Sequence, residues 1–262
     1  MITLTFHGGT MRIRATVVAV SGALALSALA VPAAQADGSS GDTKITKVVV
    51  DGDNQVTVAA SSTKSIKVSV TATDNSGIAS ADEFTLTGPN FGYLSTAKPT
   101  CVKVNATTST CSASVLVDPR VGDVFNDEAG TWYVEAWIDA KDGDFIWKEK
   151  AASVKVQRAS QLTANAAPEP VKKGKTITVT GKLTRANWET HKNAGYAGQP
   201  VKLQFRKKSA STYTTVKTIK TNSTGNLSTT VKATVDGYFR YSFAGTSTTP
   251  AVNAAGDFID VK

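Results

Sequence analysis

The side chains of this sequence that could bind a ligand by simple chemistry are aspartates grouped near glycine, asparagine or another acid. Three short segments contain them, and the candidate metal ligands are Asp51, Asp53, Asp74, Asp139, Asp142 and Asp144. Calcium takes six to eight oxygen ligands, mostly carboxylates and carbonyls, so Ca²⁺ is the cation that these segments favour. The alternative is that each Asp-Gly or Asp-Asn pair forms a hairpin turn, in which case no cofactor is required.

A second kind of candidate is a pair of aromatic side chains on one expected strand, Gly130–Ala140. Because side chains alternate along a strand, Trp132 shares one face with aliphatic residues, whereas Tyr133 and Trp137 share the other face with acids. If Trp132 faces the core, Tyr133 and Trp137 point outward, where aromatic rings can stack on sugars or anchor a protein partner. The alternative is that both rings pack against another part of the chain.

The polar segment Arg185–Gln199, which we expect to be a loop, holds a second candidate binding pair, Trp188 and Tyr196, together with His191. His191 is the only histidine after residue 36, and no Gly-x-Ser-x-Gly segment occurs. A lone imidazole without an activated nucleophile or further ligands gives neither a hydrolytic triad nor a closed zinc site. The sequence therefore predicts no catalytic residues and no enzyme activity.

Cys101 and Cys111 are the only cysteines. Val102 and Val104 alternate with polar residues after the first cysteine, which is typical of a strand entering a hairpin. Redox-active pairs usually have two residues between the cysteines, and the spacing here is much longer. We therefore expect a structural disulfide between the two strands of the hairpin.

The N-terminus has the three parts of a secretory signal peptide: the basic segment Met11–Arg14, the apolar run Ala15–Val31 and the small-residue box Ala34–Ala36. We expect residues 1–36 to be the signal peptide, with Met11 as the true start because residues 1–10 contain no Lys or Arg. The apolar run is too short and too rich in small residues to span a membrane well, so no membrane insertion is expected after cleavage. The predicted location is secreted and extracellular, with cell-wall association left open.

Charge is divided unevenly along the chain. Residues 37–157 contain 11 Lys and Arg against 16 Asp and Glu, whereas residues 158–262 contain 16 Lys and Arg against 5 Asp and Glu. Such asymmetry indicates a domain boundary and an anionic partner for the second half. Outside the cell this partner would be an anionic cell-wall polymer rather than nucleic acid. The alternative is a lysine-rich solvated surface that keeps strand edges from pairing.

Short runs rich in Val, Thr, Ile and aromatic residues alternate with turn-forming residues, and no long helical periodicity follows the N-terminal segment. This pattern is typical of an all-β protein. About seven short strands per 100 residues is the pattern of an immunoglobulin-like sandwich. We therefore predict two immunoglobulin-like β-sandwich domains in tandem: an acidic domain with the disulfide at 37–157 and a basic domain at 158–262. Stripes such as Val201, Leu203 and Phe205 predict core-facing side chains.

Motifs of both halves resemble known extracellular modules. They are Pro168–Lys175, Ile177–Leu183, Pro200–Arg206, Gly237–Arg240 and Phe243–Thr246 in the second half, and Ala72–Gly77 and Gly130–Val134 in the first. The second half resembles the bacterial immunoglobulin-like domains of exported actinomycete-type proteins. Taken whole, the chain is similar to small secreted actinomycete proteins of unknown function, some with a provisional calcium-binding label. The resemblance implies the fold well and the function poorly, because such sandwiches host many functions.

These observations predict a secreted, non-enzymatic protein that binds a partner at or near the bacterial cell surface. The partner is an unidentified protein or an anionic cell-wall polymer, and no nucleic acid is expected. A calcium-binding extracellular protein is the first alternative. A carbohydrate or cell-wall binding module that uses Tyr133, Trp137 and the basic strands is the further alternative.

Overall fold

The computed structural model describes residues 37–262, so the expected signal peptide and the Met11 start lie outside the described residues. Strands and three short 3₁₀ turns, with no α-helix, make up the regular structure of these residues. The predicted fold class, all-β of the immunoglobulin-like sandwich type, is confirmed. No helix between residues 37 and 262 has the length and apolar character needed to cross a bilayer.

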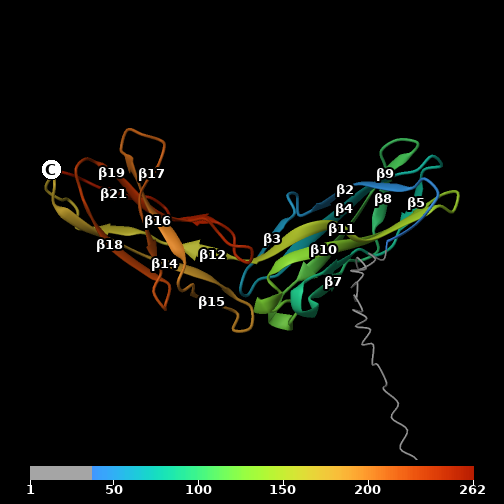
Figure 1. Cartoon of the computed structure of the whole chain (residues 1–262), viewed down its shortest axis with the longest axis horizontal. Coiled ribbons are helices and arrows are strands. Elements are labelled where there is room, and N and C mark those ends of the chain that lie inside the picture. Colours follow the sequence, from blue (N-terminus) through green and yellow to red (C-terminus); the bar gives the residue numbers. More distant parts are fainter. Residues whose placement is uncertain (1–36) are drawn as a thin grey trace, which may run out of the picture. The chain divides into compact units, whose positions relative to one another are not determined.

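Two sheets form the first half of the described chain (Figure 1). The strands of the larger sheet are β1 (Gly38–Ser40), β3 (Gln55–Val58), β5 (Ile78–Ala81), β6 (Thr85–Thr87), β7 (Tyr93–Ser95), β10 (Gly130–Ala140) and β11 (Phe145–Arg158). Their order is β1-β11-β10-β6-β7, with β3 beside β11 and β5 beside β10. The strands of the smaller sheet are β2 (Lys44–Val50), β4 (Lys64–Thr73), β8 (Thr100–Lys103) and β9 (Thr108–Val117), in the order β2-β4-β9-β8. The 3₁₀ turns are η1 (Pro89–Phe91), η2 (Pro119–Val121) and η3 (Asn126–Glu128).

Two further sheets form the second half. One contains β12 (Ser160–Leu162), β13 (Asn165–Ala167), β14 (Thr176–Asn187), β15 (Lys192–Gly195) and β18 (Asn226–Lys232), with β14 at its centre. The other contains β16 (Pro200–Lys207), β17 (Thr214–Lys220), β19 (Gly237–Phe243), β20 (Val252–Asn253) and β21 (Asp257–Ile259). In the latter sheet β16 lies between β17 and β19, and β21 pairs with β19. The strand expected at Gly130–Ala140 is present as β10.

Alternating side chains form two hydrophobic clusters. Trp132 and its same-face neighbours on β10 are fully buried in the first cluster, and Val201, Leu203 and Tyr241 are fully buried in the second. Phe205 packs against the second cluster and is partly buried. Full burial of one such side chain stabilises the fold by about 1.5 to 3 kcal/mol, so these stripes fix which face of each strand points outward.

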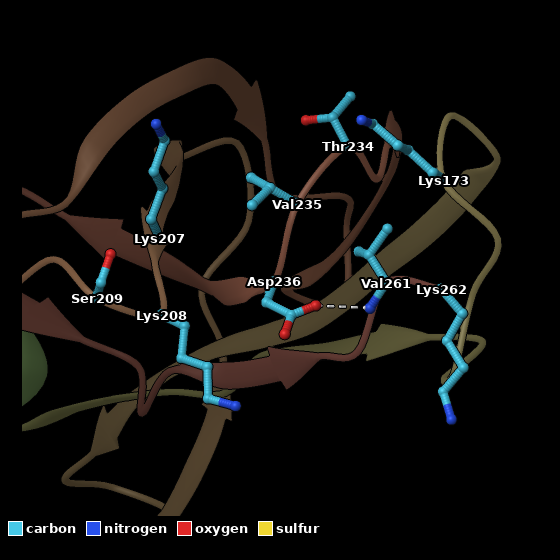
Figure 2. Close-up of a pocket in the computed structure, with 9 residues that line it drawn as sticks. All are labelled: Lys173, Lys207, Lys208, Ser209, Thr234, Val235, Asp236, Val261 and Lys262. Carbon is cyan, nitrogen blue, oxygen red and sulfur yellow. Dashed lines mark hydrogen bonds between the residues drawn. The ribbon is translucent and has the colours of Figure 1, made fainter.

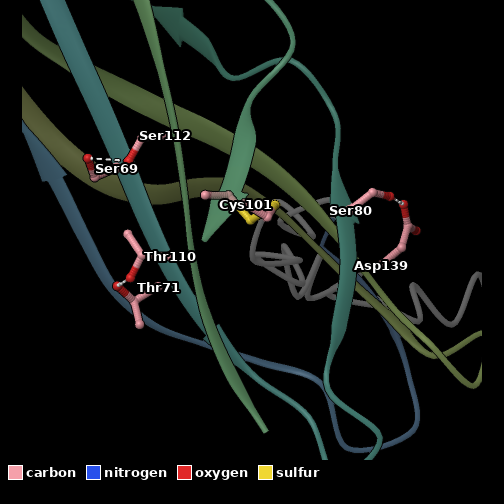
Figure 3. Close-up of a disulfide and its surroundings, with 8 residues drawn as sticks. Ser69, Thr71, Ser80, Cys101, Thr110, Ser112 and Asp139 are labelled. Carbon is pink, nitrogen blue, oxygen red and sulfur yellow. Dashed lines mark hydrogen bonds between the residues drawn. A yellow bond between two sulfur atoms is a disulfide. The ribbon is translucent and has the colours of Figure 1, made fainter. Parts of the chain in front are cut away.

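The predicted disulfide is confirmed. Cys101 on β8 and Cys111 on β9 occupy directly opposite positions and are bonded to each other, and the pairs Ser69–Ser112 and Thr71–Thr110 join β4 to β9 through their hydroxyl groups (Figure 3). The Cys111 side chain is fully buried in the first cluster. The bond therefore attaches the short edge strand β8 to the sheet.

The segment that was expected to be a polar loop joins the two halves instead. Strand β14 continues to Asn187 and pairs with β15, so most of the segment 185–199 is a hairpin. Trp188, at the start of the hairpin's turn, is only 1% exposed and belongs to the first cluster. Its indole Nε1–H donates to the carbonyl of Val58, 3.2 Å away and 130 residues earlier in the sequence. The Trp188 ring is thus buried in a core that includes β3, a strand far away in the sequence. The pattern of residues around Trp188 could not indicate this contact.

Polar contacts reinforce this junction. Arg158 is buried, and its Nε–H donates to the Ala186 carbonyl at 2.6 Å. Burial, together with the nearby Arg185, lowers the pKa of Arg158 to about 10, so the guanidinium stays charged at neutral pH. Gln157 donates from its amide nitrogen to the Thr246 carbonyl at 2.9 Å. The boundary at 157/158 stays a prediction, because side chains from both sides of it share one core.

We expect Trp188→Ala to lower the free energy of unfolding by about 3 to 5 kcal/mol, the usual cost of deleting a buried tryptophan. The matched control is Thr190→Ala, an exposed position two residues later, which should change the free energy by less than about 0.5 kcal/mol. Urea denaturation of both variants measures the difference. Equal stabilities for the two variants would show that Trp188 does not contribute to the first core.

Burial of Tyr241 predicts a loss of stability at alkaline pH. Its hydroxyl donates to the Val179 carbonyl at 2.8 Å, and burial raises the pKa of Tyr241 to about 12. In the unfolded chain the phenol ionises near pH 10, so its stabilising contribution is complete below pH 10 and is lost as the pH rises toward 12. Tyr241→Phe should be less stable by about 1 kcal/mol at pH 8. That gap should narrow between pH 10 and 12 in parallel denaturation curves, and a constant gap would contradict this account.

Candidate functional site

A hollow of about 490 Å³ lies beyond the end of β16 in the second half of the chain. Its walls come from the turn before β14, the β16–β17 connection, the β18–β19 connection and the C-terminal segment (Figure 2). The lining residues are Lys173, Lys207, Lys208, Ser209, Thr234, Val235, Asp236, Val261 and Lys262. Four of these nine residues are lysines, which makes the hollow strongly basic.

Backbone hydrogen bonds hold the walls of the lysine hollow together. The Lys208 amide donates to the Asp236 carbonyl at 3.0 Å, and the Lys173 amide donates to the Lys262 carbonyl at 2.7 Å. The Asp236 carboxylate accepts from the Val261 amide at 2.9 Å, as Figure 2 shows. The only acid of the lining therefore has a structural role, and the lysines are anchored at their backbones while their side chains stay exposed.

The charge of the lysine hollow is poorly balanced by nearby acids. Of its four lysines, only Lys262 forms an ion pair within residues 37–262, with Asp260 at 3.5 Å. Lys173, Lys207 and Lys208 have no carboxylate within 4.0 Å in the described part of the chain. Ammonium groups gathered around one concave surface create a positive potential that attracts anions.

Another candidate site, in the first half, is a group of three carboxylates that we call the carboxylate cluster. One oxygen atom from each of Asp42, Asp74 and Asp144 lies within 4.8 Å of the others. They come from three separate turns, those between β1 and β2, after β4 and between β10 and β11. The Asp144 carboxylate lies directly over Gly41. The backbone φ of Gly41 is +69°, and a Cβ on Gly41 would overlap the carboxylate. The sequence singled out Asp74 and Asp144 in different segments, and it missed Asp42.

Hydrogen bonds keep Asp74 ionised. Its side chain is only 3% exposed, and burial by itself would raise the pKa of the carboxyl group. The Ser76 hydroxyl donates to Oδ1 at 2.6 Å, the Ser76 amide donates to the same atom, and the Thr43 hydroxyl donates to Oδ2 at 2.7 Å. These donors together hold the pKa of Asp74 below its ordinary value.

The other candidate metal ligands do not join this cluster. Asp139 accepts from the Trp137 indole at 2.7 Å and from the Ser80 hydroxyl at 3.0 Å. Asp142 accepts from the Asp144 amide. Asp51 forms an ion pair with Lys64 at 2.7 Å, and Asp53 accepts from the Gln55 amide. Asp51 and Asp53 follow the end of β2, whereas Asp42 precedes its start. These four aspartates have the turn and sheet contacts of structural residues.

The outward face of β10 holds Tyr133 and Trp137, as the alternation predicts, and both rings are partly buried. Trp137 stacks on Phe145, with ring centroids 4.8 Å apart, and lies 6.2 Å from Trp147. The Trp147 indole donates to Glu135 at 2.7 Å. Phe145 and Trp147, which the sequence reasoning missed, thus pack against the predicted pair. Sugar stacking by Tyr133 and Trp137 stays a prediction. The Trp137 ring already stacks on Phe145, as the alternative of packing within the chain expects.

The remaining candidates lie in the second half and at the junction. Trp188 is buried and cannot act as a surface anchor, which corrects its assignment as a binding aromatic. Tyr196 packs edge-on against Phe243, with centroids 5.8 Å apart, and Arg185 lies 4.0 Å above its ring. His191 is exposed in the hairpin turn. These contacts give Tyr196 a packing role. Among the hydrogen bonds of residues 37–262, none joins the His191 imidazole to another side chain.

Comparisons with known proteins find only distant structural similarities. No protein-family model and no curated protein match the chain. Among solved structures, a DUF4785 family protein from Legionella pneumophila is 13% identical, with a TM-score of 0.38 over 78% of this chain; the chain spans only 56% of that protein. The D00-D0 domain of intimin is 15% identical, with a TM-score of 0.27 over 81% of this chain and 99% of that one. Three N-terminal domains of the bacteriophage RB49 outer capsid protein Hoc are 9% identical, with a TM-score of 0.29 over 84% and 71%. Similarities this distant carry no argument about a ligand or partner.

Proposed function

We propose that this is an exported, non-enzymatic immunoglobulin-like protein that binds an anionic polymer at the bacterial cell surface through its basic second half. Export is supported by the signal-like N-terminus and by the Cys101–Cys111 disulfide, because disulfides persist in oxidising compartments. The resemblance to secreted actinomycete proteins agrees with export. No residue constellation of the described chain suggests chemistry on the bound polymer.

The lysine hollow is the observation that carries this proposal. It is a concave surface with three ammonium groups that have no acid partner in residues 37–262, within a half that has 16 basic and 5 acidic residues. A lysine surface that served only solubility would not need to gather four lysines from three separate segments around one concavity. Long flexible lysines suit a polymer whose charges repeat along a chain, since each ammonium group can adjust to a nearby anion.

Removing two of these charges should weaken binding to a polyanion. We expect Lys173→Ala/Lys207→Ala to bind polygalacturonate or polyphosphate about 10-fold more weakly at 50 mM salt, a loss of about 1.4 kcal/mol. Raising the salt from 50 to 200 mM should weaken the wild type steeply and the variant less, because exposed charge contacts are screened. Fluorescence anisotropy with labelled polymer measures both effects.

The matched control is Lys67→Ala/Lys155→Ala, which removes two exposed lysines from the first half and changes the net charge equally. This control should bind within about 2-fold of the wild type. Equal losses in the two double variants would mean that only net charge matters. A wild type that binds neither polymer at 50 mM salt would refute the proposed function.

The carboxylate cluster favours calcium binding as a second candidate function. Asp42, Asp74 and Asp144 supply oxygens from three turns, and Asp74 is held in its ionised form by its hydrogen bonds. Ca²⁺ accepts flexible geometry and completes its shell with carbonyls and water, whereas Mg²⁺ demands a regular octahedron. A bound Ca²⁺ would relieve the repulsion among the three carboxylates and tie the three turns together.

If calcium binds there, millimolar Ca²⁺ should raise the midpoint of thermal unfolding by several degrees, since ligand at about 100 times its Kd adds about 2.7 kcal/mol. Mg²⁺ at the same concentration should have little effect. Asp144→Asn should abolish the calcium shift, and the control Asp53→Asn, outside the cluster, should retain it. An unchanged midpoint across millimolar Ca²⁺ would leave the three aspartates as turn residues.

A further inference from the structure

The outward face of the β16–β19–β21 sheet carries a row in which cations lie between or beside aromatic rings. We call this row the cation–aromatic ladder, and its members in spatial order are Lys208, Phe258, Tyr238, Arg206, Tyr213 and Arg240. The sequence patterns assign none of these residues by number to a candidate site, although Arg206, Tyr238 and Arg240 lie within the motifs that carry the resemblance. Lys208 also lines the lysine hollow, so the two features form one continuous surface.

Close stacking distances connect the members. The Lys208 ammonium lies 5.3 Å from the Phe258 ring centroid, and the Phe258 and Tyr238 rings are 5.1 Å apart. The Arg206 guanidinium lies 3.9 Å above Tyr238 and 5.3 Å from the Tyr213 ring. The Arg240 guanidinium lies 3.9 Å from Tyr213. Every cation therefore rests on at least one aromatic face, a contact worth about 0.5 to 2 kcal/mol depending on exposure.

Sheet register places four of these side chains together. Arg206 on β16 is opposite Tyr238 on β19, and Tyr238 is opposite Phe258 on β21. Arg240 is opposite Gln204, two residues along β16 from Arg206. Because the intervening residues point into the second cluster, all of these side chains emerge on the outward face.

Tyr213 precedes β17 and contributes its ring to both guanidinium groups. Its hydroxyl lies directly against the α-carbon of Gly256, where a Cβ would overlap the phenolic oxygen. The absence of a side chain at Gly256 therefore lets Tyr213 lie in this position. The ring that supports both arginines is thus set by a residue in the connection between β20 and β21.

Each of the two guanidinium groups donates one hydrogen bond and forms no ion pair within residues 37–262. Arg206 donates from Nη1 to the Ala210 carbonyl, and Arg240 donates from Nε to the Gln204 side chain, each at 2.9 Å. A guanidinium has five N–H donors, and neither group has a carboxylate within 4.0 Å or another protein acceptor in residues 37–262. Both side chains are partly buried, so two oriented positive charges lie side by side without a counter-charge from the described chain.

We propose that the cation–aromatic ladder is a binding face for planar or tetrahedral oxyanions, carboxylate or phosphate, repeated along a polymer that continues into the lysine hollow. The guanidinium fork matches two oxygens of such a group at once, which a lysine ammonium cannot do. Stacking on Tyr213 and Tyr238 fixes the forks in advance, so less side-chain entropy is lost on binding. This inference rests on the proposed function for its polymer, but it assigns a recognition geometry that net charge alone would not produce.

Arg206→Lys/Arg240→Lys tests the geometry because it keeps both charges. We expect this variant to bind polygalacturonate and polyphosphate about 10-fold more weakly than the wild type. The matched control is Arg185→Lys, which makes the same substitution at another arginine stacked on a tyrosine, away from the ladder, and should bind within 2-fold of the wild type. Gly256→Ala should weaken binding about 3-fold by displacing Tyr213, and circular dichroism and thermal unfolding confirm that each variant is folded.

The outcomes separate this inference from the proposed function. If the Arg206→Lys/Arg240→Lys variant binds like the wild type while Lys173→Ala/Lys207→Ala binds weakly, the ladder is not a recognition site and the proposed function stands. If the wild type binds neither polymer, both are overturned. A loss with polygalacturonate alone assigns the face to carboxylates, and a loss with polyphosphate alone assigns it to phosphates. An equal loss in Arg185→Lys would overturn the inference.

Discussion

Burial of every second side chain of β16 and β19 is the constraint on which the proposed binding surface depends. Leu203, Phe239 and Tyr241 point into the second core and are nearly or fully buried. Each contributes about 1.5 to 3 kcal/mol to the stability of the fold. The core therefore holds Arg206 and Arg240 on the same outward face even though neither has a counter-charge there.

Side-chain contacts also cross the expected boundary between the two halves of the chain. Trp188 extends from the second half into the first core, and Arg158 donates to the Ala186 carbonyl beside it. The buried guanidinium of Arg158 is tolerated because this hydrogen bond compensates part of the cost of burial, and although burial lowers its pKa to about 10, the group is still charged at neutral pH. The acidic half and the basic half therefore belong to one compact unit of the described chain. The cation–aromatic ladder lies on a sheet of this unit.

The sequence predicts the fold of this protein better than its surface. Strand alternation is a local signal, so the stripes through Trp132 and Leu203 and the hairpin closed by Cys101 and Cys111 follow from the sequence. Trp188 was misplaced because its environment is supplied by a strand 130 residues away. Residues 185–199 were expected to be a loop because their composition is polar, whereas most of them belong to the hairpin of β14 and β15.

The candidate sites were the least predictable part, because each is assembled from several turns or strands. The carboxylate cluster combines Asp74 and Asp144, from two separate candidate segments, with Asp42, which no motif singled out. The charge excess of residues 158–262 signalled a basic surface, yet only strand register shows that Arg206 and Arg240 flank Tyr213. Spacing in the sequence carries no information about such cross-strand neighbours.

The anion-binding surface can be located by nuclear magnetic resonance of ¹⁵N-labelled residues 37–262 titrated with a short oligogalacturonate or polyphosphate. The account predicts that the Nε–Hε resonances of Arg206 and Arg240 and the backbone amides of residues 206–213 shift together, while the amides around Tyr133 and Trp137 do not move. Shifts confined to the aromatic face of β10, or scattered evenly over all lysines, would contradict a built anion-binding surface in the second half.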